Sequence, residues 1–222
     1  MKAAFITVPC PAEGIQFGEL PQPQPRAGEV LVRVRAVAVN PIDTYVRAGM
    51  VKMSLPLPFI IGCDLAGVVE SAGQRFQPGD RVWCSNQGLF GRQGSFAEFA
   101  CVEERWLNLT PAAVRDEDAA AIALVGITAH IGLFAKARLQ AGETVMVNGG
   151  AGGVGSLVVQ LAKAVGARVI ATAGSDERVA KARSFGADLA LNHRSQDVAA
   201  AVKEFAPAGV DVFWETQREP DF

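Results

Sequence analysis

Hydrophobic and polar residues alternate with a period of two over much of the first half of the chain. In EVLVRVRAVAVN, residues 29 to 40, every second position from Val30 to Val34 is a valine, and arginines occupy two of the positions between the apolar ones. This alternation predicts a strand with one buried face. AGVVESAG and GDRVWC are typical of further strands entered through Gly and Asp turns. We therefore expect residues 1 to 116 to form an antiparallel, barrel-like, β-rich domain.

From Asp116 the pattern changes to apolar strands that alternate with amphipathic helices. A helix is predicted over DEDAAAIALVGITAHIGLF, with acidic residues at the positive end of its dipole. Near-continuous apolar strands separated by helices are typical of a parallel sheet covered on both faces. Residues 117 to 222 are thus predicted to form a partial, doubly wound Rossmann sheet, which makes the chain α/β with a β-rich N-terminal domain. The predicted strands are TVMVN, ARVIATAG, DLALN and VDVFWET, and the predicted helices are SLVVQLAKAVG, SDERVAKARSFGA and DVAAAVKEFA.

A cluster of glycines, VNGGAGGVGS at 147 to 156, separates the first of these strands from the helix after it. Its G-x-G-x-x-G spacing, in a strand–loop–helix context, indicates a dinucleotide-binding loop. Such glycines allow a tight turn, the approach of a pyrophosphate and close packing of helix on strand, while the helix N-terminus attracts phosphate. A loop that only needs tight turns is the alternative, and a P-loop is excluded because no Lys-Ser or Lys-Thr follows. The predicted contacts are Asn148, Gly150, Ala151, Gly152, Gly153, Val154 and Gly155.

The end of the second predicted strand indicates which dinucleotide binds. An NAD site has an acidic residue there to hold the ribose 2′-hydroxyl, whereas this chain has small neutral residues that leave room for a 2′-phosphate. Two charge-assisted hydrogen bonds of roughly 1.5–3 kcal/mol each would favour NADP(H) by about a hundredfold or more. Asp176 and Glu177 keep NAD open as the alternative, because either could hold a ribose hydroxyl instead of capping the helix. The residues predicted to surround the 2′-phosphate are Gly174, Ser175, Arg178 and His193.

Composition and charge narrow the classes of partner. The 222-residue chain is 50% hydrophobic and 20% charged, with a formal net charge of −2 and no basic block, so we expect no nucleic-acid partner. The N-terminus has no signal-peptide pattern and the four cysteines have no CxxC spacing, which favours a cytoplasmic protein with free thiols. Residues 119 to 135 carry no formal charge, but they include glycines and a histidine, and we expect a buried helix there instead of a membrane span.

Several ordered motifs resemble one known family. NPIDTYVRAG, GCDLAGVVESAG, GITA, NGGAGGVGSLVVQLAKAVGARVIATAGS and NHR together resemble the zinc-independent quinone oxidoreductases, the zeta-crystallin-like branch of the medium-chain dehydrogenase/reductase superfamily. The resemblance spans nearly the whole chain. It implies a GroES-like catalytic domain over residues 1 to 116 and a Rossmann NADP-binding domain over residues 117 to 222. It also implies that NADPH donates a hydride to a quinone, and that the full-length family forms homodimers.

The resemblance further implies residues on the acceptor side of the active site. Asn40, Asp43 and Tyr45 would line it, with Tyr45 near the nicotinamide and able to donate a hydrogen bond to the developing oxyanion. Each has an ordinary alternative: Asn40 as part of a turn, Asp43 as a helix cap and Tyr45 as a packing residue. Thr128 matches a family position whose hydroxyl lies near the nicotinamide, with helix packing as its alternative. His130 stands where an aromatic residue is common, and we expect it to be buried and hydrogen-bonded.

Catalytic zinc is not expected. The resemblance implies that zinc-dependent relatives place a Cys where this chain has Asn40 and a Gly-His-Glu where it has Gly62-Cys63-Asp64. A catalytic zinc has three protein ligands plus water, and Cys63 and Asp64 without an imidazole are a poor set. A quinone is already electrophilic. The cofactor can therefore carry the hydride step while the protein holds the reactants in register.

The chain closes on VDVFWETQREPDF, directly after the fourth predicted Rossmann strand, which becomes an exposed apolar edge. Members of the family run on beyond this point, so the sequence resembles a C-terminally truncated form. Two other functions stay open. One is reduction of the carbon–carbon double bond of an enal or enone, and the other is binding of NADPH without turnover, as in a crystallin-like protein. In both enzymatic interpretations the partner is a small quinone or conjugated carbonyl.

Overall fold

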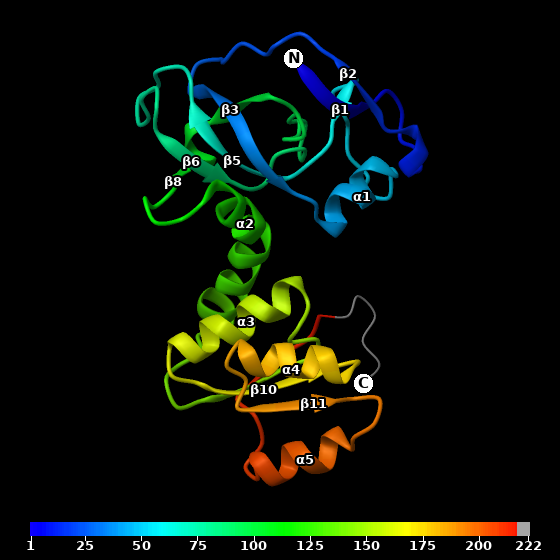
Figure 1. The fold of residues 1–222 in the computed structure, drawn as a ribbon, viewed down its shortest axis with the longest axis vertical. Coiled ribbons are helices and arrows are strands. Elements are labelled where there is room, and N and C mark those ends of the chain that lie inside the picture. The colour runs from blue at the N-terminus through cyan, green and yellow to red at the C-terminus, as the bar shows by residue number, and fades with distance from the viewer. Residues whose placement is uncertain (217–222) are drawn as a thin grey trace. The chain divides into compact units, whose positions relative to one another are not determined.

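The computed structural model describes residues 1 to 216 of the chain (Figure 1). The chain divides into two units, Met1–Leu124, here called unit 1, and Val125–Phe222, called unit 2. The helix α2 (Asp116–His130) contains the boundary and runs directly into a π-helical segment, η3 (Ile131–Lys136). Unit 1 is mainly β and unit 2 alternates strands with helices, which confirms the two patterns predicted from the sequence.

Unit 1 is built on two antiparallel sheets. One has the strand order β7-β3-β5-β6-β8 and the other the order β2-β1-β4. The alternation predicted for β3 is confirmed, because Val30 and Val32 are fully buried and Arg33 is exposed. The elements of unit 1 before α2 are β1 (Lys2–Ile6), η1 (Ala12–Gly14), β2 (Gln16–Glu19), β3 (Glu29–Ala38), α1 (Pro41–Arg47), β4 (Phe59–Ile60), β5 (Asp64–Val69), β6 (Arg81–Cys84), β7 (Phe99–Glu103), η2 (Glu104–Trp106) and β8 (Asn108–Leu109).

Unit 2 contains a parallel sheet with the strand order β11-β10-β9-β12. Counted from the first strand of the unit, this order is 3-2-1-4, as at the start of a Rossmann fold. β12 lies at one edge of the described sheet, as predicted. The elements are β9 (Thr144–Val147), α3 (Gly153–Ala164), β10 (Arg168–Ala173), α4 (Asp176–Ser184), β11 (Leu189–Asn192), α5 (Val198–Phe205) and β12 (Val212–Trp214).

Helices cover both faces of this sheet, as Figure 1 shows for α3 and α4 on one side and α5 on the other. Val169 and Ala171 of β10 are buried in the same cluster as Val159 of α3. Ile170, whose side chain points the opposite way, packs with Phe205 of α5. The predicted apolar strands are therefore buried on both sides. This arrangement places the loops that follow the strands together at the carboxyl edge of the sheet.

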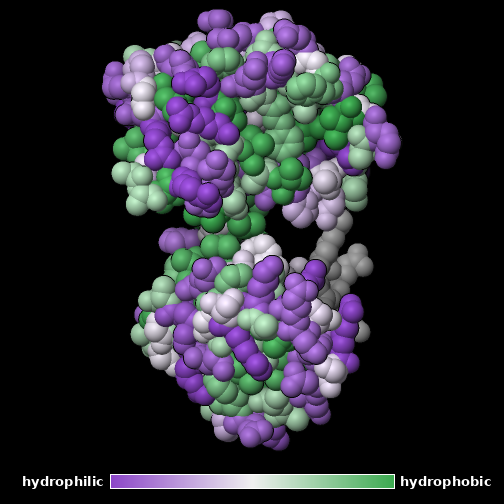
Figure 2. Space-filling model, in the orientation of Figure 1, coloured by the Kyte–Doolittle hydropathy of each residue, from purple (hydrophilic) through white to green (hydrophobic). Residues whose placement is uncertain are grey.

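The continuous helix from Asp116 to Lys136 is the one helix, among residues 1 to 216, that is long and apolar enough to cross a membrane by length and composition alone. Core helices of globular proteins also meet these two criteria. Ala120 and Ala123 are fully buried, whereas Ile122 and Ile131 are 46% and 47% exposed. The predicted buried helix is therefore only partly buried. Figure 2 shows hydrophobic and hydrophilic residues interspersed over the visible face of both units.

Candidate functional site

The glycine-rich loop connects β9 to α3 at the carboxyl edge of the parallel sheet. Gly149 has a φ of +77°, in the left-handed region that favours glycine, and makes the tight turn. A Cβ on Gly150 would lie 2.7 Å from the Cβ of Ala171, and a Cβ on Gly155 would overlap the carbonyl oxygen of Gly149. These two glycines let helix, loop and strand pack closely, as the fingerprint predicts. Gly149 is not among the predicted contacts, although it directly precedes the motif.

The N-terminus of α3 offers free donors to an anion. Gly152 is the N-cap and has no side chain to satisfy the first turn. The backbone N–H groups of Gly153, Val154 and Gly155 donate to no acceptor within residues 1 to 216. The dipole of this 12-residue helix adds partial positive charge at the same point. Together these features suit a phosphate or pyrophosphate.

The side chain of Asn148 is bound to other parts of unit 2. Its Nδ2 donates to the Glu215 carboxylate at 2.9 and 3.1 Å, and its Oδ1 accepts from the Thr172 hydroxyl at 2.6 Å. Its backbone oxygen accepts from the Thr216 hydroxyl at 2.8 Å. Asn148 therefore ties the start of the loop to β10 and to the residues after β12. A direct contact between its amide and a cofactor stays a prediction.

Basic side chains converge at the end of β10. Because Gly174 has no side chain, His193 Cε1 and Arg194 Nε both lie 3.4 Å from the position that a Cβ would take there. Ser175 caps α4 by accepting from the backbone N–H of Arg178 at 3.4 Å, and the Arg178 side chain is exposed. Arg194 is an addition to the predicted set. The NHR motif contains it, but spacing alone does not reveal which of two consecutive side chains approaches β10.

The two acidic residues after Ser175 have different surroundings. Asn192 donates its Nδ2 to Asp176 Oδ1 at 2.7 Å, which ties the start of α4 to the end of β11. The Glu177 carboxylate is exposed and makes no hydrogen bond or ion pair within residues 1 to 216. Asp176 is thus already engaged in the fold. Glu177 is the acidic side chain left for the predicted alternative, a bond to a ribose hydroxyl.

In unit 1, Asn40 and Asp43 lie together at the buried start of α1. The backbone N–H of Asn40 donates to Asp43 Oδ2 at 2.7 Å, so Asp43 caps the helix. The side chain of Asn40 reaches β5, where its Nδ2 donates to Asp64 Oδ2 at 2.8 Å. Asn40 and Asp43 are 5% and 3% exposed, whereas Tyr45 on the same helix is 36% exposed. The structure therefore brings Asn40 and Asp43 together with Asp64, which was not predicted as a site residue.

Asp43 and Asp64 form an acidic cluster with Asn40, and the groups that donate hydrogen bonds to the two carboxylates are neutral. Burial raises the pKa of both Asp43 and Asp64 above the ordinary carboxyl value. The Ser85 hydroxyl and the Asn40 amide partly oppose the shift in the pKa of Asp64, and the nearby charge of Asp43 adds to it. Neither carboxylate makes an ion pair within residues 1 to 216. One oxygen of each, Oδ1, also lacks a hydrogen bond of ordinary geometry in that part of the chain.

The cluster does not fit a zinc site. Over the described part of the chain, no three His, Cys, Asp or Glu side chains are placed to hold a metal ion. A zinc-bound cysteine is a thiolate. Burial and the charge of Asp43 raise the pKa of the Cys63 thiol, which keeps it protonated. Asn40 offers an N–H to Asp64 in place of a metal ligand.

Thr128 and His130 lie on the part of α2 that belongs to unit 2, and both are exposed. The His130 ring packs edge-on against Phe134 with ring centroids 5.0 Å apart. The expectation of a buried His130 is wrong, because within unit 2 this helix buries the face that carries Ala129 and Leu133 and leaves His130 exposed. The same helix approaches the glycine loop, since a Cβ on Gly153 would lie 3.5 Å from Val125 Cγ1.

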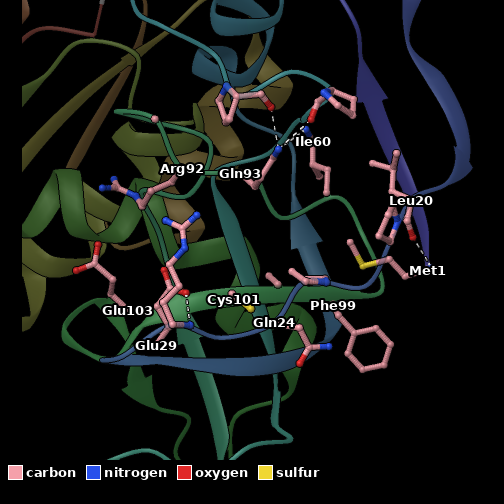
Figure 3. Close-up of a pocket in the computed structure, with 18 residues that line it drawn as sticks. Met1, Leu20, Gln24, Glu29, Ile60, Arg92, Gln93, Phe99, Cys101 and Glu103 are labelled. Atoms are coloured by element: carbon pink, nitrogen blue, oxygen red, sulfur yellow. Dashed lines mark hydrogen bonds between the residues drawn. The ribbon is translucent and has the colours of Figure 1, made fainter.

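A cavity of about 390 Å³ in unit 1 contains none of the predicted residues. Figure 3 shows it between β7, the Pro-rich segment 21–26 and the loop that carries Arg92 and Gln93. Its one thiol belongs to Cys101. Burial raises the pKa of that thiol to about 11, so it is protonated at neutral pH. The cavity therefore offers no reactive nucleophile, and the candidate site stays with the glycine loop and the cluster on α1.

Known proteins resemble both units. Residues 26–112 match the family described as alcohol dehydrogenase GroES-like domain, and residues 153–221 match the one described as zinc-binding dehydrogenase. Rat (Rattus norvegicus) quinone oxidoreductase is 37% identical over 197 residues, or 87% of this chain and 59% of the relative. A solved structure of an NAD-dependent alcohol dehydrogenase gives a TM-score of 0.90 at 32% identity, over 96% of this chain and 70% of the other. This chain belongs to the medium-chain dehydrogenase/reductase superfamily, in its quinone oxidoreductase group.

Other members of the superfamily extend the comparison. A chloroplastic NADPH-dependent alkenal/one oxidoreductase from Arabidopsis thaliana is 40% identical over 185 residues, or 79% of this chain and 48% of the relative. Escherichia coli quinone oxidoreductase complexed with NADPH gives a TM-score of 0.82 at 29% identity, over 93% of this chain and 63% of the other. The predicted family and the predicted GroES-like and Rossmann folds are thus confirmed. The chain spans 59% of the length of the rat enzyme.

Proposed function

We propose that unit 2 binds NADP(H) and that the whole protein transfers a hydride from it to a quinone. The observation that carries the cofactor assignment is the end of β10, where Gly174 leaves space beside His193 and Arg194. A 2′-phosphate would occupy that space and accept charge-assisted hydrogen bonds. The E. coli relative complexed with NADPH supports the same assignment.

The proposed phosphate contacts come from two places in unit 2. The free N–H groups of Gly153, Val154 and Gly155 would hold the pyrophosphate at the N-terminus of α3. Arg194 and His193, together with Arg178 and the Ser175 hydroxyl, would hold the 2′-phosphate. Each bond from a charged donor contributes roughly 1.5–3 kcal/mol, which favours NADPH over NADH by about tenfold or more per bond.

The acceptor would meet residues of unit 1. When bound, the reduced nicotinamide supplies the hydride, and conversion of a quinone to a hydroquinone also consumes one proton. We assign the orientation of the acceptor to Asn40, Asp43 and Tyr45. The hydroxyl of Tyr45, a residue that is 36% exposed, would donate to the oxygen that gains negative charge. The proposal needs no metal ion, because Cys63 and Asp64 are not a zinc ligand set.

A second acceptor class is the conjugated enal or enone. The same residues would orient a carbonyl next to a carbon–carbon double bond, and hydride would then add to the double bond. The Arabidopsis alkenal/one oxidoreductase, at 40% identity, favours this alternative. Comparison of a quinone with an enone under identical conditions separates the two classes.

The remaining proposals concern the protein as a whole. We propose that residues 1–116 are the catalytic domain and residues 117–222 the NADP-binding domain. We also propose that the whole protein is a cytoplasmic homodimer without nucleic-acid or membrane partners. The resemblance to the family supports the dimer. The composition of the chain supports the absence of a nucleic-acid partner.

The test is an equilibrium titration of the purified chain with NADPH and with NADH, followed by fluorescence. We expect NADPH to bind at least tenfold more tightly. Addition of 1,4-naphthoquinone to the NADPH complex then tests turnover through the fall in absorbance of the reduced nicotinamide. Tighter binding of NADH would reject the 2′-phosphate assignment, and binding of NADPH without oxidation would favour a non-catalytic role.

A further inference from the structure

Asp64 is the most deeply buried carboxylate in contact with a proposed acceptor residue. It is 0% exposed and lies on β5, whereas Asn40 at the start of α1 is 5% exposed. The Asn40 Nδ2 donates to Asp64 Oδ2 at 2.8 Å, and the backbone N–H of Leu124 donates to the same oxygen at 3.2 Å. Of the two side chains, only Asn40 keeps any exposed surface. Asp64 can therefore act on an acceptor only indirectly, through a neighbour such as Asn40.

The contact with Asp64 is not required for capping the helix. The N-terminus of α1 already has a capping box, in which Asp43 accepts the Asn40 N–H at 2.7 Å and the Asn40 side chain accepts from the backbone N–H of Asp43. The bond from the Asn40 side chain to Asp64 instead joins residues 24 positions apart, on a helix and a strand. It fixes the amide with its nitrogen towards β5. A bond that a helix start does not need, made to a buried carboxylate, indicates a demand on the orientation of the amide itself.

The chemistry of the amide shows what this orientation provides. An asparagine side chain has two N–H donors on one nitrogen. Asp64 takes one of them, and Nδ2 makes no second hydrogen bond within residues 1 to 216. The remaining N–H is the type of group that binds a carbonyl oxygen as it gains negative charge. A reversed amide would present an oxygen instead, which would repel the oxygen of a quinone or an enone.

This arrangement lowers the free energy of unfolding of the protein. A buried carboxylate without a paired cation is destabilising, because its charge is removed from water. The carboxylate of Asp43 lies close by and increases the cost, as its effect on the pKa of Asp64 shows. Buried charges of this kind cluster at functional sites. An apolar residue on β5 would pack at lower cost, but it could not hold the Asn40 nitrogen.

We propose that Asp64 is a positioning residue, which holds the Asn40 amide so that its second N–H is presented to the carbonyl oxygen of the acceptor. This proposal rests on the proposed function, since it takes Asn40 as an acceptor-binding residue. Asp64 itself touches no acceptor. Its action is to hold the nitrogen of a neighbouring amide whose oxygen faces the start of α1.

The first test needs no acceptor. In ¹⁵N-labelled protein, the side-chain amide resonances of Asn40 are assigned by their loss in Asn40→Ala and compared between wild type and Asp64→Asn. We expect the hydrogen-bonded proton of Asn40 to move upfield in Asp64→Asn, because a charged acceptor is replaced by a neutral one. Glu104→Gln is the matched control, since it neutralises another buried carboxylate of unit 1 away from Asn40. Unchanged Asn40 resonances in Asp64→Asn would overturn the proposal.

The second test measures coupling. The dissociation constant of 1,4-naphthoquinone is measured by fluorescence on the chain saturated with NADP⁺, for Asn40→Ala, Asp64→Leu and the double variant. Each single change is expected to weaken binding about tenfold, and the double variant to bind no more weakly than either alone. Additive losses would overturn the positioning role. If Asp64→Leu does not fold, Asp64→Asn takes its place, with a smaller loss expected because its amide oxygen can still accept.

The two tests distinguish the assignment of Asn40 as an acceptor-binding residue from the positioning role of Asp64. If wild type binds no quinone, or if Asn40→Ala binds it as well as wild type does, the acceptor assignment fails. The resonances of Asn40 would in that case still decide whether Asp64 orients the amide. If the Asn40 resonances depend on Asp64 and the losses of quinone affinity in the two single variants are not additive, both the acceptor assignment and the positioning role hold.

Discussion

Asn192, at the end of β11, donates its Nδ2 to Asp176 Oδ1 at 2.7 Å, and so occupies the first acidic residue after β10. An acidic side chain near this position is what distinguishes NAD sites from NADP sites. Because Asp176 is engaged with Asn192, this carboxylate would compete less with the basic residues around Gly174 in the cofactor site proposed above. This contact adds to the space at Gly174 as a reason to expect NADPH selectivity.

Asp176→Asn is therefore expected to leave the affinity for NADH unchanged within about twofold. The bond to Asn192 would weaken and the melting temperature would fall slightly, because a charged acceptor is exchanged for a neutral one. Fluorescence titration with NADH and thermal unfolding check the two effects. A loss of NADH affinity by tenfold or more would show that Asp176 holds the ribose after all.

Arg194→Ala is expected to weaken NADPH binding by about tenfold to a hundredfold and to leave NADH binding unchanged, because it removes one charge-assisted bond to the 2′-phosphate. The measurement is a paired titration with both nucleotides. Lys203→Ala, an exposed change on α5, serves as the control for loss of positive charge. An equal effect of Arg194→Ala on both nucleotides would place Arg194 outside the 2′-phosphate site.

Gly155→Ala is expected to abolish dinucleotide binding and to lower the melting temperature, because its Cβ would overlap the carbonyl oxygen of Gly149. Gly153→Ala is the matched control for stability, since the nearest atom to its Cβ would be 3.5 Å away, at ordinary contact distance. Thermal unfolding of the two variants should therefore differ clearly. Equal melting temperatures would mean that the loop can relax around an added methyl group.

Asp64→Asn is expected to raise the melting temperature at neutral pH. Burial raises the pKa of Asp64 in the folded chain above its unfolded value of about 3.9. The folded state then holds more protons between the two values, so wild-type stability falls as pH rises through that window. The advantage of the variant should vanish below about pH 4. Unfolding scans across pH 3 to 8 measure it, and a variant less stable at every pH would contradict this account.

Glu104→Gln is expected to lower the melting temperature at neutral pH, which is the opposite of the effect expected for Asp64→Asn. The Glu104 carboxylate accepts the backbone N–H groups of Arg75 and Phe76 at 2.8 and 3.2 Å, and the Arg75 bond in particular lowers its pKa. A lowered pKa means that the stabilisation is present above the unfolded value, about 4.3, and is lost as pH falls. The variant should melt below wild type at pH 7 and approach it in acid. A constant difference across pH would assign the effect to packing.

Several strands and helices of this protein and its glycine-rich loop can be predicted from the sequence alone. Alternating valines predict β3, and the G-x-G-x-x-G spacing between strand and helix predicts the β9–α3 turn. These features are local, because strand alternation and the torsion angles of glycine act within a few residues of one another. For the same reason, Gly150 and Gly155 were predictable from spacing alone.

Which polar groups meet depends on the tertiary structure. Asn40 and Asp64 are 24 residues apart and Asn148 and Glu215 are 67 apart, and their contacts depend on how the strands and loops pack. His130 is exposed because the helix buries the face of Ala129 and Leu133 within unit 2, which a helix of nearly uniform apolar character does not reveal. Local torsion preferences specify elements, but the partners of a buried amide or carboxylate are specified by strand register and packing, since those bring distant residues within hydrogen-bonding distance.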